Sequence, residues 1–222
     1  MKGNKRNIAH TGRQCADLAA RLLVEGSARG FAHARRKAAD RLNIVDTRQL
    51  PDNRALFCAL IDYQRLFDRP TVTARTARLR QAALDAMQFF EQFSPFLTGA
   101  VMYGTPLEQS PICFHLFTDE VEAISRFLLT HRYAYRLAEI SYRISSRLSE
   151  RYSRYEISRE LFDYELIVMP LRRLAQAPLD PLDGNPFERL SPAQLEVILA
   201  TGPGELYACG PRSIDELIAG RE

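Results

Sequence analysis

Apolar residues in the first part of the chain recur at the three- and four-residue spacing that places them on one face of a helix. The pattern is clearest in the stripe Cys15, Leu18, Ala19, Leu22 and Leu23. The same spacing predicts further helices over residues 30–42, from Pro51-Asp52 onwards, and over 74–93. We therefore expect residues 1–94 to form a small helical bundle.

The pattern changes after Ser94-Pro95, where short apolar runs alternate with Gly, Pro and polar residues. Such runs predict strands over 96–98, 112–117, 133–140 and 160–169. Residues 142–155 do not distinguish helix from strand. The fold class expected is thus α+β, in which the helical bundle precedes a mixed sheet with flanking helices formed by residues 95–222.

Three helix starts are predicted in this second part from capping residues. Asp119 and Glu122 would cap a helix over 120–131, Ser191 has a proline and a glutamine behind it, and Ser213 begins a last short helix. The connector before Ser191 is rich in Pro, Asp and Gly, which is typical of turns.

The composition is that of a folded globular protein, with 222 residues, 46% hydrophobic and 26% charged. The net charge of +3 does not indicate a partner by itself. No apolar run is long enough for a membrane span, and the basic N-terminus has no apolar run behind it, so we expect neither a membrane protein nor a secretory signal. The cysteines (Cys15, Cys58, Cys113, Cys209) are far apart and form no Cys-x-x-Cys, which favours reduced thiols in a cytoplasmic protein.

One stretch carries chemical information. A predicted strand ends at Gly99-Ala100, a second glycine follows at Gly104, and Ser110-Pro111-Ile112-Cys113 leads into the next predicted strand. This arrangement resembles the signature of the nucleotidyltransferase superfamily, which has the polymerase-β-like fold. In that signature Gly-Ser ends a strand and an Asp-x-Asp pair begins the next one. The resemblance implies a glycine turn whose amides approach a triphosphate, and carboxylates that hold Mg²⁺.

The chain departs from the signature at the metal-binding positions. Pro111 and Cys113 stand where the two aspartates would be, and neither offers the oxygen ligands that Mg²⁺ requires. A third acidic position has two candidates, Asp163 and Glu165, which would share one strand face. The resemblance is therefore to a degenerate branch of the superfamily, found in bacteria. The remnant of its nucleotide pocket would comprise Gly99, Ala100, Gly104, Ser110, Asp163 and Glu165.

Such a remnant implies a protein that binds a nucleotide or another phosphorylated ligand, or that regulates a protein partner, and needs no cofactor. One alternative is an active Mg²⁺-dependent nucleotidyltransferase that uses the displaced carboxylates Glu108, Asp119 and Glu165. Asp163 and Glu165 also have a purely structural interpretation, in which they form ion pairs with arginines. The candidates for that pairing are Arg159, Arg172 and Arg173.

A second alternative is an adaptor that binds nucleic acid through the N-terminal helices. Residues 1–48 hold eleven Lys and Arg against four Asp and Glu. The candidate basic surface comprises Arg29, Arg35, Arg36, Lys37 and Arg41. A solvated helix face is the commoner meaning of such a run, and aromatic residues for base stacking are scarce there, so nucleic acid is not favoured.

Cys113 and His115 would share a strand face and could be imagined as metal ligands. No further ligand has a matching spacing, so a buried thiol and a hydrogen-bonded histidine are favoured instead.

Overall fold

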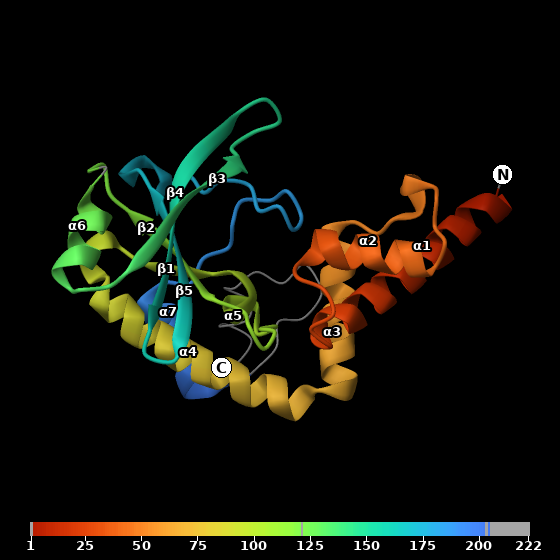
Figure 1. Ribbon diagram of the computed structural model, residues 1–222, viewed down its shortest axis with the longest axis horizontal. Helices are drawn as coiled ribbons and strands as arrows, with labels where there is room; N and C mark the ends of the chain where they lie inside the picture. The colour runs from red at the N-terminus through yellow and green to blue at the C-terminus, as the bar shows by residue number, and fades with distance from the viewer. Residues whose placement is uncertain (1, 121, 203, 205–222) are drawn as a thin grey trace. The chain divides into compact units, whose positions relative to one another are not determined.

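The computed structural model describes residues 2–120, 122–202 and 204. Within these residues the protein is α+β, as the sequence pattern predicts, with seven α-helices and one five-stranded sheet (Figure 1). The described chain divides between Val72 and Thr73 into two compact units. Among the described helices, none is both long enough and apolar enough to cross a membrane.

The first unit is helical. It contains α1 (Lys2–Val24), α2 (Phe31–Arg41), the short 3₁₀ helix η1 (Thr47–Gln49) and α3 (Asn53–Phe67). Most of the predicted apolar stripe of α1 is buried here, including Cys15, Ala19, Leu22 and Leu23. The predicted start of the third helix is confirmed, because the side chain of Asp52 accepts a hydrogen bond from the backbone N–H of Ala55 at 2.7 Å.

The helix α4 (Arg69–Phe89) begins earlier than expected and packs, from Thr73 on, within the second unit. The buried guanidinium of Arg80 donates to the carbonyls of Val101 and Met102, at 3.2 and 2.7 Å. The division at residue 72 thus differs from the expected boundary after residue 94. The helical period identified α4 correctly, but the period alone does not show which neighbouring element covers the apolar face.

The second unit is built on a mixed sheet with the strand order β1-β2-β5-β4-β3. Its strands are β1 (Phe96–Thr98), β2 (Ile112–Phe117), β3 (Tyr135–Arg143), β4 (Ser149–Arg159) and β5 (Phe162–Met169). β2 and β5 are parallel, and the other neighbours are antiparallel. The stretch that sequence left ambiguous is the tip of the β3–β4 hairpin and most of β4.

The unit also contains α5 (Gly99–Tyr103), α6 (Ala123–Thr130) and α7 (Pro192–Thr201), together with the 3₁₀ helices η2 (Glu91–Phe93) and η3 (Leu171–Arg173). The predicted capping box at Ser191 is confirmed, with Gln194 as the reciprocal partner. The predicted cap of α6 is wrong: its N-terminal residue Glu122 makes no side-chain cap, and Asp119 instead accepts a hydrogen bond from Leu171 N–H at 3.0 Å. Ser213 lies outside the described residues.

The two faces of the sheet are covered differently. On one face, Phe89 of α4 contacts Phe127 of α6, and Ser125 of α6 is hydrogen-bonded to Tyr155 of β4 at 2.8 Å. The connector over residues 170–190 lies against the other face, where the ring of Phe187 contacts His115. Because side chains alternate along a strand, this second face carries the odd-numbered residues of β2 and β5, including Cys113 and Glu165.

The cysteines of the described residues do not all match the expectation of reduced thiols. Cys15 and Cys113 are free, whereas Cys58 is disulfide-bonded. The expectation of a free thiol at Cys58 is wrong, because the spacing of cysteines along a chain does not show which of them the fold brings together. The cytoplasmic location expected from that spacing stays a prediction.

Candidate functional site

Two of the predicted pocket residues, Gly99 and Glu165, lie beside Cys113, the position that the resemblance assigns to the second aspartate. Cys113 of β2 is in register with Thr98 of β1 on one side and with Glu165 of β5 on the other. Gly99 follows Thr98 with a φ of +72°, and a Cβ added there would lie 3.6 Å from the Cβ and Sγ atoms of Cys113. Gly99, Cys113 and Glu165 are therefore neighbours in the described fold.

The side chains at the positions that the resemblance assigns to metal binding do not suit Mg²⁺. The Sγ atom of Cys113 lies 3.7 Å from Oε2 of Glu165 and 3.7 Å from the carbonyl oxygen of Pro111. Burial, together with the neighbouring charge of Glu165, raises the pKa of the Cys113 thiol, which therefore stays protonated at neutral pH. A neutral thiol and a proline offer no side-chain oxygen ligand, and Glu165 is the one carboxylate among these three positions.

Glu165 is neutralised by an arginine that the sequence did not single out. Nη1 of Arg154, on the adjacent strand β4, lies 3.2 Å from Oε1 of Glu165. Nη2 of the same guanidinium lies 2.6 Å from Oε1 of Glu156, the residue of β4 that is in register with Glu165. Glu165 thus forms an ion pair, but the predicted partners are wrong: the partner is Arg154 rather than Arg159, Arg172 or Arg173.

The Arg154 guanidinium has an unused donor. Its Nε atom is buried and has no hydrogen-bond partner among the described residues. The side chains of Arg154, Glu165 and Glu156 are 28%, 26% and 33% exposed, so the ion-paired ends of these groups reach solvent. Arg136 of β3 completes the row, with Nη1 at 3.8 Å from Oε2 of Glu156. Two positive and two negative side chains therefore balance each other across β3, β4 and β5.

The other predicted pocket residues play local roles in the described structure. The carbonyl of Ala100 accepts a hydrogen bond from Thr105 N–H at 2.9 Å, and Gly104 ends α5 with a φ of +74°. The hydroxyl of Ser110 accepts a hydrogen bond from Leu107 N–H at 2.9 Å. Asp163 is exposed and accepts a hydrogen bond from Ser158 at 2.6 Å, so it forms none of the expected ion pairs.

Two groups near Cys113 and Glu165 were not predicted. Burial, with the nearby groups of Cys113, Glu165 and Asp180, raises the pKa of the Tyr142 hydroxyl. Asp180 belongs to the connector and is 9% exposed, and its carboxylate accepts hydrogen bonds from Tyr103 at 3.4 Å and from a backbone N–H of the connector. The Pro- and Asp-rich sequence indicated a turn here, but no sequence signal placed that turn beside β2.

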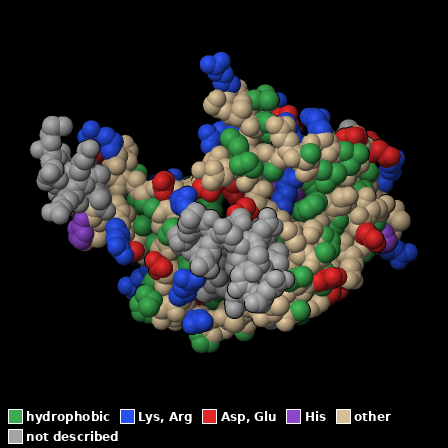
Figure 2. All heavy atoms as spheres, turned by 180° about the vertical axis from the view of Figure 1, so that it is seen from behind, with side chains coloured by type: hydrophobic (Ala, Val, Ile, Leu, Met, Phe, Trp, Pro, Cys, Tyr) green, Lys and Arg blue, Asp and Glu red, His purple; other side chains and the backbone are tan. Residues whose placement is uncertain are grey.

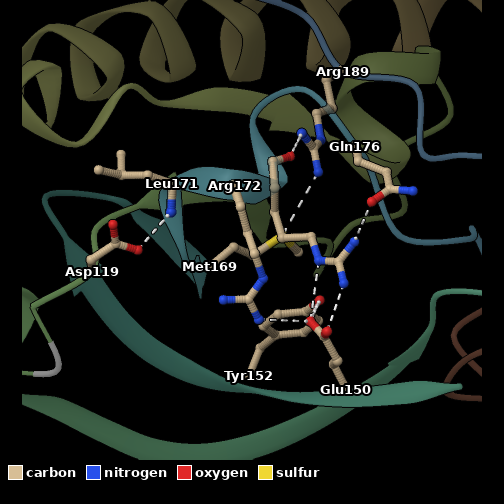
Figure 3. A network of polar contacts seen from close by, with 9 residues as sticks. Asp119, Glu150, Tyr152, Met169, Leu171, Arg172, Gln176 and Arg189 are labelled. Atoms are coloured by element: carbon tan, nitrogen blue, oxygen red, sulfur yellow. Dashed lines mark hydrogen bonds and ion pairs between the residues drawn. The ribbon is translucent and has the colours of Figure 1, made fainter.

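The connector is fixed to the sheet by a network of arginine contacts, which Figure 3 shows from close by. The Arg173 guanidinium, which is 5% exposed, donates to both oxygens of Glu150, at 2.6 and 3.1 Å. Arg189 donates to the carbonyl of Arg173 at 2.8 Å and to Nδ1 of His115 at 3.1 Å. Burial, with the charge of Arg189, lowers the pKa of His115, so this imidazole is neutral and accepts a hydrogen bond, as expected for a structural histidine.

The structure separates the displaced carboxylates proposed for an active enzyme. Glu108 lies exposed in the turn before β2, and Asp119 follows the opposite end of β2 from Cys113. No group of three or more His, Cys, Asp or Glu side chains suited to a metal ion occurs within the described residues. The carboxylates expected for a metal site thus remain apart in the described fold.

Two members of the predicted basic surface form hydrogen bonds within the protein, and the other three are exposed. Arg35 donates from Nη1 to the carbonyl of Pro51 and to Oδ1 of Asn53, both at 3.2 Å, and Lys37 donates to the carbonyl of Ser27 at 2.9 Å. Three arginines of the set remain exposed, namely Arg29, Arg36 and Arg41. On the face shown in Figure 2, basic side chains alternate with acidic ones instead of forming one continuous patch.

No family model, no curated protein and no solved structure matches this chain. Its function is therefore argued from the site alone.

Proposed function

We propose that this chain is a non-catalytic binding protein with a nucleotidyltransferase-like pocket, whose ligand is a nucleotide or another phosphorylated molecule. The proposed binding site comprises the glycine turn at Gly99 together with Cys113 and Glu165 on the sheet. The observation that carries the proposal is the register of β1, β2 and β5, which brings these three positions together.

Binding without catalysis follows from the side chains present. Transfer of a nucleotidyl group in this superfamily depends on metal ions held by carboxylates, which activate the attacking oxygen and stabilise charge on the phosphates. Pro111 and Cys113 cannot hold such an ion, and Glu165 is already paired with Arg154. What remains is a glycine turn that permits close approach of a phosphate to the backbone.

Isothermal titration calorimetry tests the proposal. ATP, GTP, CTP and UTP are titrated into the full chain, once with Mg²⁺ and once with EDTA. We expect at least one nucleotide to bind in both buffers with similar affinity. Tight binding that strictly requires Mg²⁺, or Mg²⁺-dependent transfer of labelled nucleotide abolished by Glu165→Ala, would establish the active-enzyme alternative instead.

A glycine variant and a matched control locate the binding site. Gly99→Ala forces a side chain into a φ of +72° and brings its Cβ against Cys113, so we expect weaker nucleotide binding. Gly26→Ala introduces the same kind of backbone strain, at a φ of +69°, in the helical unit, with no atom within 4 Å of the added Cβ. Equal loss of affinity in both variants would argue against a pocket at Gly99.

A further inference from the structure

We infer that Arg154 serves as the cation of this proposed site: its guanidinium binds the anionic group of the ligand directly, in the role that a divalent metal ion has in a catalytic pocket. This inference rests on the proposed function and deepens it by assigning a binding residue. The inference also says what binding changes. The oxyanion of the ligand replaces Glu165 and Glu156 as the hydrogen-bond acceptor of the Arg154 guanidinium.

The position of Arg154 is the first support. Its Nη1 lies 3.2 Å from Oε1 of Glu165, the carboxylate at the third acidic position of the resemblance. A cation held by that carboxylate is what a metal-dependent pocket would contain at the same place. Here the cation belongs to the chain itself, and the neighbouring thiol of Cys113 adds no charge that would attract a second one.

The chemistry of the guanidinium is the second support. An arginine side chain stays charged at all physiological pH values and offers five N–H donors in a planar fork that fits phosphate and carboxylate oxygens. Two of its nitrogens face Glu165 and Glu156, and the buried Nε has no partner among the described residues. An unsatisfied buried donor is unfavourable, so a rearrangement of the side chain that gives Nε an acceptor would be favoured on binding.

The electrostatic balance is the third support. Arg154 and Arg136 face Glu165 and Glu156, so these four side chains nearly balance one another in charge in the free protein. An incoming anion competes with the two carboxylates for Arg154, and a divalent cation placed beside the guanidinium would be repelled by it. The two carboxylates therefore weaken the binding of an anion, whereas in a metal-dependent pocket Glu165 would strengthen it.

This difference in sign gives the decisive experiment. Binding of the nucleotides and of inorganic pyrophosphate is measured by calorimetry in EDTA for the full chain and for Glu165→Gln. The substitution keeps the shape of the side chain and removes its charge, so we expect binding about two- to fivefold tighter. In a metal-dependent pocket the same substitution removes a ligand of the ion, and binding of the Mg²⁺–nucleotide would become weaker.

Arginine variants supply the second arm. Arg154→Gln should weaken binding about tenfold or more, because it removes a charge-assisted contact to the ligand. Arg154→Lys keeps the charge without the planar fork and should recover part of the affinity. Arg151→Gln is the matched control, since Arg151 lies on the same strand but is 76% exposed and pairs with Glu139 outside this set of charges, so its loss should leave binding unchanged. Thermal unfolding followed by circular dichroism checks that each variant is folded.

The outcomes separate the two proposals. Absence of binding by the wild-type chain and by Glu165→Gln, with pyrophosphate and with all four nucleotides, refutes both. Binding that Glu165→Gln weakens, or that Arg154→Gln leaves unchanged in a folded variant, refutes the role of Arg154 and leaves the proposed function standing. If Arg154→Gln does not fold, Glu165→Gln decides the question alone, because its expected effect is a gain.

Discussion

The carboxylate of Glu150 offers a stringent test of how the connector is held on the sheet. It accepts hydrogen bonds from Arg173 at 2.6 and 3.1 Å and from the hydroxyl of Tyr152 at 2.8 Å, and Arg172 lies 3.5 Å away (Figure 3). Because Arg173 is almost fully buried, Glu150→Gln leaves a buried guanidinium without its counter-charge. Loss of that charge is expected to destabilise the second unit.

The magnitude follows from the ionisation of Glu150. Its hydrogen bonds from Arg173 lower the pKa from 4.5 to about 2. Since the pKa is lower in the folded than in the unfolded chain, the stabilisation is complete above pH 4.5 and disappears as the pH falls towards 2. A lowering of this size corresponds to about 3 kcal/mol. The Glu150 side chain is 23% exposed, so screening by solvent makes about 2 to 3 kcal/mol the expected loss for Glu150→Gln at pH 7.

The assay is urea unfolding followed by far-ultraviolet circular dichroism, since the chain contains no tryptophan. The difference between wild type and Glu150→Gln should be largest at pH 7 and shrink steadily between pH 4.5 and pH 2. Glu139→Gln is the matched control on the same hairpin, because the ion pair of Glu139 with Arg151 is exposed and its loss should change little. A difference below about 0.5 kcal/mol at pH 7, or one independent of pH, would refute the reasoning.

Three further predictions concern other buried groups. The imidazole of His115, whose pKa is lowered by burial and by Arg189, should show no titration by NMR between pH 5 and pH 8; a midpoint near the ordinary value of 6.5 would contradict its described surroundings. The thiol of Cys113 should react slowly with iodoacetamide at pH 8 in the folded chain and rapidly in urea, and Glu165→Gln should speed the native reaction because Glu165 helps to raise the thiol pKa; fast native labelling detected by mass spectrometry would be the contrary result. Replacement of Arg80 by Met should cost about 2 to 3 kcal/mol in urea unfolding, because the carbonyls at the end of α5 lose their buried donors; an unchanged midpoint would show that α5 does not depend on this contact.

Local elements were predictable because their signals are local. The strands 96–98 and 112–117 have the predicted bounds, and the capping box at Ser191 is present, because glycine, proline and capping side chains act within a few residues of the backbone they shape. The hairpin over residues 135–159 was only partly predicted. Its strands are polar on the exposed side, and each strand forms only by pairing with the other.

Only part of the candidate site could be predicted from the sequence, because only part of it depends on signals that are local in the chain. The sequence by itself determined that Pro111 and Cys113 carry no carboxylate, because that depends on residue identity alone; that carboxylates belong at these positions is an implication of the resemblance. Only the tertiary structure decided that Arg154 neutralises Glu165 and that Asp180 lies beside the same face, since strand register and the path of the connector bring together residues that are distant in the chain. Charge compensation acts across space, so it becomes visible only when the strands are paired.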